Sequence, residues 1–148
     1  MTLARSRPVP QLQRVLGSSL EQVAAFCREL RAFLLAHRLA NVAFAVELVA
    51  REVLDNAVIH GNRSVADRKI EVQLWLRDSS VRLQVSDEGK GFPWRLQSHS
   101  STDAVGPSGR GLPLCFENAD RVHFNPCGNQ VTLWIRTGSR KPRSIAGG

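Results

Sequence analysis

The chain has 148 residues, of which 43% are hydrophobic, so it is long enough for one domain with a sizeable core and too short for two ordinary domains. Its formal net charge of +7 points first to nucleic acid or an anionic surface. The excess, however, lies in residues 1–14 and 136–148, which contain basic side chains and no acidic ones. Because a specific nucleic-acid site usually needs a patterned basic face, we expect no specific nucleic-acid partner.

The cysteines and the apolar segments indicate the cellular compartment that we expect for the protein. Cys27, Cys115 and Cys127 are odd in number and form no C-x-x-C pair, which predicts neither a disulfide framework nor a zinc site. The first residues, MTLARSRPVP, lack the apolar segment of a signal peptide, and no run approaches the roughly 20 apolar residues of a membrane span. We therefore expect a cytoplasmic protein with no membrane partner.

The first part of the chain predicts one short strand and two helices. Residues 9–16 favour a strand, although Pro8 and Pro10 push its start toward an edge. A helix is predicted from about Ser19, a candidate N-cap, to residue 37. A second amphipathic helix begins after Asn41, another candidate N-cap, and its apolar stripe continues until a glycine at position 61.

The rest of the chain predicts two hairpins separated by an aperiodic stretch. Alternating apolar residues predict paired strands at 70–76 with 81–86, and at 122–124 with 130–135. Residues 92–108 lose this periodicity and gather Ser, Pro, Gly and Asp, which is typical of a functional lid or a disordered link. A short helix over residues 111–119 is compatible with a proline in its first turn.

These elements predict the fold class α+β. We expect a two-layer α/β sandwich in which a mixed, mostly antiparallel sheet is covered on one face by helices. The expected domain spans residues 9–136, with flexible basic ends at 1–8 and 137–148.

Three polar residues on the second predicted helix share one ridge. Glu52, Asn56 and His60 are spaced four apart, which puts successive Cβ atoms about 5–6 Å from each other on a helix. Taken alone, such a row is usually a solvated helix face. Two later segments change that interpretation.

The first of these segments is VSDEGKGFPW, in which Asp87 ends a predicted strand and is followed by Gly89 and Gly91. A carboxylate only accepts hydrogen bonds, so it can bind the exocyclic amine of adenine and reject guanine, which has a carbonyl there. The glycines allow positive φ and close approach of a ligand to the backbone. An ordinary Asp-Gly turn is the simpler alternative.

The second segment is GRGLPL, formed by Gly109, Arg110, Gly111, Leu112 and the two residues that follow. Its free amides and the predicted helix start are able to meet a phosphate group. Arg110 either donates to phosphate oxygens or faces solvent, and the sequence favours neither. The chain contains no G-x-x-x-x-G-K-[ST] loop and no dinucleotide-binding glycine turn.

The order Glu-x-x-x-Asn, Asp-x-Gly-x-Gly and Gly-x-Gly-Leu resembles the N box and the two glycine boxes of the GHKL ATPase superfamily, over roughly residues 9–136. Within that superfamily the segment from Glu52 to Gly61 is similar to the N box of the anti-sigma-factor serine/threonine kinases. The resemblance implies the same two-layer ATP-binding fold, with ATP and Mg²⁺ as cofactors.

The resemblance also implies a role for each site residue. Asn56 matches the magnesium ligand, a neutral amide oxygen that suits a hard, hydrated cation. Glu52 matches the general base that orients the attacking hydroxyl and takes its proton. Asp87 matches the adenine acceptor, and the glycine boxes enclose the nucleotide. His60 either approaches phosphate or is a hydrogen-bonded structural histidine, and the structural role is favoured.

We therefore expect a protein serine/threonine kinase that phosphorylates an anti-sigma factor antagonist and regulates a sigma factor or another response regulator. One alternative is a nucleotide-controlled binding switch with little kinase activity, and another is the detached ATP-binding domain of a histidine kinase. A homodimer is compatible with the resemblance. The serine-rich stretch before Gly109 and the proline at position 113 depart from the family pattern.

Overall fold

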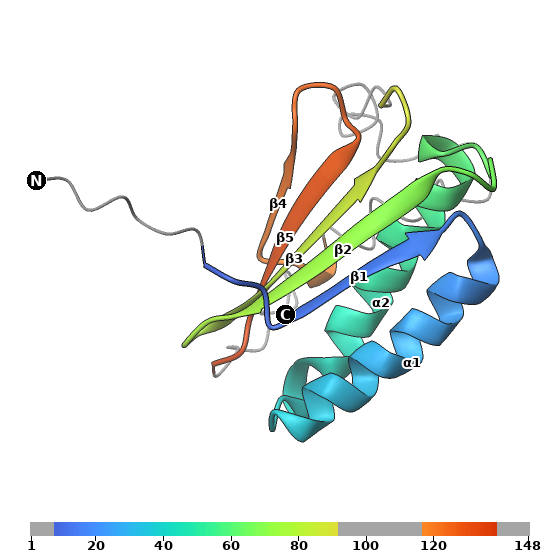
Figure 1. Cartoon of the computed structure of the whole chain (residues 1–148). Helices are drawn as coiled ribbons and strands as arrows, with labels where there is room; N and C mark the ends of the chain where they lie inside the picture. Colours follow the sequence, from blue (N-terminus) through green and yellow to red (C-terminus); the bar gives the residue numbers. More distant parts are fainter. Residues whose placement is uncertain (1–7, 92–116, 139–148) are drawn as a thin grey trace, which may run out of the picture.

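The computed structural model describes residues 8–91 and 117–138 (Figure 1). In chain order its elements are β1 (Leu12–Gly17), α1 (Leu20–Ala36), α2 (Ala40–Asn56), a π-helical turn η1 (Ala57–Gly61), β2 (Lys69–Leu76), β3 (Ser80–Asp87), β4 (Arg121–Phe124) and β5 (Gln130–Arg136). The predicted helix over residues 111–119 falls mostly outside the described residues, as does the predicted lid or link at 92–108.

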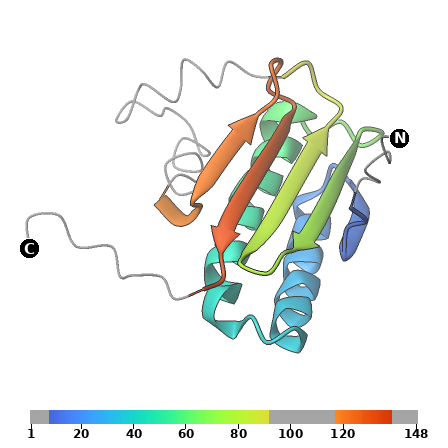
Figure 2. The same cartoon turned by 90° about the vertical axis from the view of Figure 1, so that its left-hand side faces the viewer.

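The five described strands form one sheet in the order β1-β2-β3-β5-β4. Each pairing is antiparallel, which agrees with the predicted mostly antiparallel sheet, and no described pair of strands is parallel. Helices α1 and α2 pack against one face of this sheet, and the opposite face carries no helix from the described part of the chain (Figures 1 and 2). The predicted two-layer α+β sandwich is confirmed.

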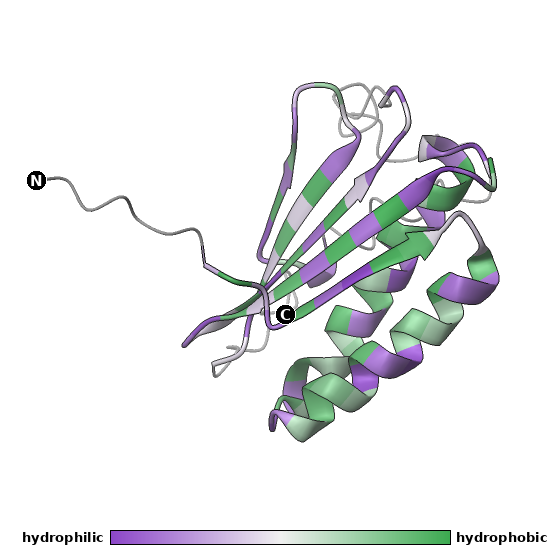
Figure 3. Cartoon of the chain, in the orientation of Figure 1, coloured by the Kyte–Doolittle hydropathy of each residue, from purple (hydrophilic) through white to green (hydrophobic). Residues whose placement is uncertain are grey.

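The core lies between the two layers. The hydropathy colouring shows that apolar and polar residues alternate along the strands (Figure 3). Because successive side chains of a strand point to opposite faces, the apolar set faces the helices. Leu74, Leu83 and Leu133 pair across β2, β3 and β5 and are fully buried, as are Leu30 of α1 and Leu54 of α2. Burial of each such side chain stabilises the fold by roughly 1.5–3 kcal/mol.

The helix starts test the two predicted N-caps. Ser19 caps α1, and its side chain accepts a hydrogen bond from the backbone N–H of Gln22. The prediction for Asn41 is wrong, because α2 begins at Ala40 without a side-chain cap. Asn41 instead donates from Nδ2 to the carbonyl of Thr137, 3.0 Å away, and so ties the start of α2 to the chain just beyond β5.

The face of the sheet opposite the helices carries a cross-strand ladder of arginine and tryptophan. In register, Trp75 pairs with Arg82, Arg82 with Trp134, and Trp134 with Arg121. The Arg82 guanidinium carbon lies 4.7 Å from the ring centroid of Trp75, and that of Arg121 lies 4.8 Å from the ring centroid of Trp134. These distances are those of cation–π contacts, which stabilise neighbouring strands.

Candidate functional site

The last turns of α2 carry two of the predicted site residues. Glu52 and Asn56 are both half-buried on this helix, which packs against β3 and β5. The Oδ1 atom of Asn56 is itself buried, and it accepts no hydrogen bond from the described residues. A buried acceptor without a donor costs free energy unless a ligand satisfies it. Asn56 therefore fits the role of a ligand to a hard cation.

The predicted α-helix does not continue regularly to Gly61. Residues Ala57–Gly61 form a π turn, and the backbone N–H of Asn62 donates to the carbonyl of Ala57 at 2.7 Å. A π turn is wider than an α turn and often occurs at functional sites. The regular i, i+4 spacing thus holds from Glu52 to Asn56, but His60 lies on the wider turn, with an exposed side chain.

Asp87 ends β3 on the side of the sheet that faces the helices, because it pairs in register with the buried Ile70. Its Oδ1 accepts a hydrogen bond from the Gly89 backbone N–H at 2.8 Å. Burial raises the pKa of the Asp87 carboxyl above its usual value of 3.8, although the Gly89 hydrogen bond and the charge of Arg68 oppose that shift. The carboxylate is thus held in a fixed position in a partly dehydrated site.

Gly61 brings the helix motif and the Asp87 motif together. A Cβ atom added to Gly61 would overlap the Asp87 carboxylate, and one added to Gly89 would overlap the Gly61 carbonyl. Side chains at these two positions would therefore displace the backbone or the carboxylate. The close approach places Asp87 one π turn from Asn56, so the acid and the amide lie on the same side of the molecule.

The turn between β4 and β5 supports the Asp87 segment from the other side. The Asn129 carbonyl accepts from the Asp87 N–H at 2.9 Å, and Asn129 Nδ2 donates to the Gly89 carbonyl at 3.2 Å. Gly91 has a φ of 90°, and a Cβ there would overlap the carbonyl of Cys127. Glycine at position 91 is thus required by both conformation and space.

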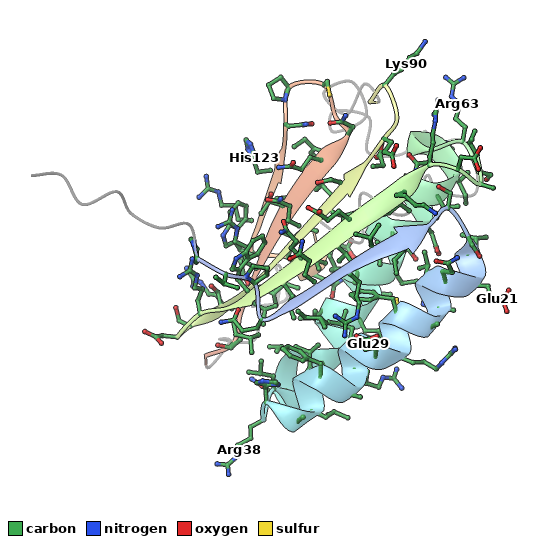
Figure 4. All side chains as sticks on the ribbon, viewed as in Figure 1. Glu21, Glu29, Arg38, Arg63, Lys90 and His123 are labelled. Carbon is green, nitrogen blue, oxygen red and sulfur yellow. The ribbon has the colours of Figure 1, made fainter. Side chains whose placement is uncertain are left out.

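Asn62 supports the site from behind, and the sequence analysis did not single it out. Its side chain is fully buried, donates to Ser18 Oγ and to the Lys69 carbonyl, and accepts from the Glu88 N–H. Two exposed cations, Arg63 and Lys90, project outward at the same end of the molecule (Figure 4).

The structure brings together the predicted residues Glu52, Asn56, Asp87, Gly89 and Gly91, with His60 at the edge of the group. The remaining predicted residues, Gly109, Arg110, Gly111 and Leu112, lie outside the described residues. Neither helix in the described ranges has the length and apolar character that a membrane crossing requires.

Fold and site together define a GHKL-type α/β sandwich, with an N-box helix beside an Asp-x-Gly turn. The chain belongs to the histidine kinase-like ATPase domain family, whose model matches residues 16–135. No curated protein matches the chain.

Among solved structures, the chain is similar to the histidine kinase domain of a blue-light activated histidine kinase from Erythrobacter litoralis EL346. The two share 22% sequence identity with a TM-score of 0.46, over 64% of this chain and 44% of that one. The chain therefore spans less than half of the length of that structure.

Proposed function

We propose that this protein binds Mg-ATP between the end of α2 and the Asp87 turn and phosphorylates a serine or threonine of a partner protein. The observation that carries the proposal is the buried Oδ1 of Asn56, which accepts no hydrogen bond from the part of the chain that the structure describes and lies one π turn from the Asp87 carboxylate. An acceptor for an adenine amine and a ligand for a hard cation then face one site, as a magnesium–adenine nucleotide requires.

The chain's own residues have distinct tasks in this proposal. Asp87 accepts from the adenine amine, and glycine at positions 61 and 89 lets the carboxylate and the two backbone segments pack closely at that point. Glu52, four residues before Asn56, orients the attacking hydroxyl and takes its proton. Mg-ATP, when bound, supplies the phosphoryl group and the cation that offsets its charge. Phosphoryl transfer depends mainly on such positioning and charge stabilisation.

The proposed partner follows from the resemblance of the N box, here read from Glu52 to Gly61, to that of the anti-sigma-factor kinases. We infer that the substrate is an anti-sigma factor antagonist, and that the kinase alternates between this antagonist and a sigma factor in the cytoplasm. A nucleotide-controlled binding switch and a detached histidine-kinase ATP-binding domain are the competing functions.

Calorimetric titration with ATP, ADP and GTP, with and without Mg²⁺, tests the nucleotide site. We expect adenine-selective binding that magnesium strengthens, and an Asn56→Ala protein in which magnesium no longer strengthens binding. Equal affinity for ATP and GTP in the native protein would contradict the proposed site.

Incubation with labelled ATP and a candidate antagonist tests the kinase. Glu52→Gln should lower transfer by about 10²-fold or more while ATP still binds, because only the base is lost. Glu47→Gln is the matched control on the same helix, since Glu47 accepts from Arg31 of α1 at 2.6 Å. Equal transfer by Glu52→Gln and native protein would refute the assignment of the base, and an acid-labile product would identify a histidine kinase instead.

A further inference from the structure

Asn62 joins three segments that are far apart in the sequence. Its Nδ2 donates to Ser18 Oγ at 2.8 Å, in the link between β1 and α1, and to the Lys69 carbonyl at 3.0 Å, where β2 starts. Its Oδ1 accepts from the Glu88 N–H at 2.8 Å, directly after β3. Every N–H of this carboxamide is thus used, and its oxygen is satisfied.

The same contacts extend into a closed network. Ser18 Oγ donates to the Arg68 carbonyl at 2.7 Å, and the Lys69 N–H donates to a Glu88 carboxylate oxygen at 2.6 Å. The Asn62 side chain has 0% exposure, so it is not accessible for direct contact with a ligand that binds from solvent. A hydrogen-bond network centred on a fully buried, fully satisfied carboxamide holds the segments around it in one arrangement.

Asn62 holds Glu88, which is the middle residue of the Asp87 turn. Glu88 separates Asp87 from Gly89, and Gly61, which precedes Asn62, fits against both. A shift of Glu88 would therefore move the Asp87 carboxylate relative to the helix that carries Asn56. The backbone of Asn62 is fixed too, since its N–H closes the π turn.

We propose that Asn62 is a positioning residue that sets the orientation of the Asp87 carboxylate and thereby the selectivity for adenine over guanine. The inference rests on the proposed nucleotide site. It assigns the base selectivity to the hydrogen bond between Asn62 Oδ1 and the Glu88 N–H, and assigns the two bonds donated by Asn62 to fold stability alone.

Two substitutions separate these contributions. Asn62→Ala removes all three hydrogen bonds, whereas Asn62→Asp keeps the acceptor for Glu88 and loses both donors. Ser18→Ala is the matched control, because it removes one partner of Asn62 without touching the Glu88 bond. Thermal unfolding and the ratio of ATP to GTP dissociation constants are measured for all four proteins with Mg²⁺ present.

We expect all three variants to unfold at lower temperature than the native protein, since each loses at least one partly buried hydrogen bond. Only Asn62→Ala should lose base selectivity, by about tenfold, which corresponds to one well-placed hydrogen bond. Asn62→Asp and Ser18→Ala should stay within about twofold of the native ratio. A native ratio retained in Asn62→Ala, or lost equally in Asn62→Asp, would overturn the inference.

Backbone amide exchange of Gly89 is a readout that needs no nucleotide. Its N–H donates to Asp87 Oδ1, so it should exchange faster in Asn62→Ala than in Ser18→Ala. If Asn62→Ala does not fold, Asn62→Ser, whose hydroxyl is too short to reach all three partners, takes its place in both measurements. Unchanged Gly89 exchange in the Asn62 variant would overturn the positioning role. If Gly89 exchange changes as expected but the native protein does not prefer ATP to GTP, only the proposed nucleotide site is refuted.

Discussion

Asp87 combines a fixed position with a partly dehydrated carboxyl group. Burial raises the pKa of this carboxyl in the folded protein above the 3.8 of an unperturbed aspartate. An acid whose pKa is higher in the folded state favours folding below its unfolded pKa, and this contribution is lost as pH rises through the folded pKa. At neutral pH the ionised carboxylate therefore opposes folding while it provides the acceptor for adenine.

Replacement of Asp87 by Asn should separate stability from binding. The amide can still accept from the Gly89 N–H but carries no charge, so the unfolding temperature at pH 7 should equal or exceed that of the native protein. ATP affinity should fall by about tenfold or more, because the adenine amine loses a charged acceptor.

Thermal unfolding between pH 3 and pH 7, followed by circular dichroism, checks the first part of that prediction. Any gain in stability of Asp87→Asn over the native protein should be absent below about pH 3.8. It should grow as pH rises from about 3.8 through the folded pKa of Asp87. If the stability of Asp87→Asn relative to the native protein fell between pH 3 and pH 7, the assigned cause of the pKa shift would be contradicted.

Sequence reasoning at the residue scale found the residues with distinctive chemistry and missed their support. Glu52, Asn56 and Asp87 stand in spaced motifs, and the motifs taken together indicated a site. Asn62 follows the N box as one more polar residue before the predicted strand at 70–76. Its role depends on Ser18 and Glu88, which are 44 and 26 residues away, and no local pattern contains such contacts.

At the scale of elements, the π turn at the end of α2 determines where the helix layer meets the sheet. Gly61 closes this turn and has no space for a side chain, because the Asp87 carboxylate lies against it. Gly138, by comparison, is exposed, and a Cβ atom added there would meet nothing within 4 Å.

Gly61→Ala should therefore destabilise the protein by about 1–3 kcal/mol, the usual cost of overpacking, and weaken nucleotide binding as well. Gly138→Ala is the matched control and should change neither property. Urea denaturation and nucleotide titration of both variants provide the measurement. Equal stability of the two alanine variants would show that Asp87 does not lie against Gly61 in solution.

The strand alternation and the helical stripes predicted most described elements to within a few residues, because each buries one face in a common core. Two details escaped this reasoning. The apolar stripe of α2 runs through η1 without interruption, so periodicity could not distinguish a π turn from an α turn. Asn41 has the residue type of an N-cap, but its side chain binds Thr137, which is 96 residues away in the sequence.

At the scale of the whole molecule, the tight packing of α1 against the other elements makes one thiol inaccessible. Cys27 is fully buried, and burial raises the pKa of its thiol from 9.0 to about 11. Cys127, in the turn between β4 and β5, is exposed. Reaction of Cys27 therefore requires that the core opens.

In a Cys115→Ser protein at pH 8, a thiol reagent should modify Cys127 quickly and Cys27 at least about 100-fold more slowly, because Cys127 is exposed whereas Cys27 is buried and reacts only after the core opens. Both should react at comparable rates in denaturant. Mass spectrometry of the labelled peptides gives the two rates, and similar native rates would contradict the packing of α1.

The cation–π ladder on the face of the sheet opposite the helices also determines what optical spectroscopy can report. Trp75 and Trp134 stack on arginines across the sheet from the Asp87 carboxylate, so their emission should change little when a nucleotide arrives. The third indole of the chain, Trp94, stands in the sequence between the first and second glycine boxes. Phenylalanine at positions 75 and 134 would leave that single chromophore as an intrinsic sensor, without any attached dye.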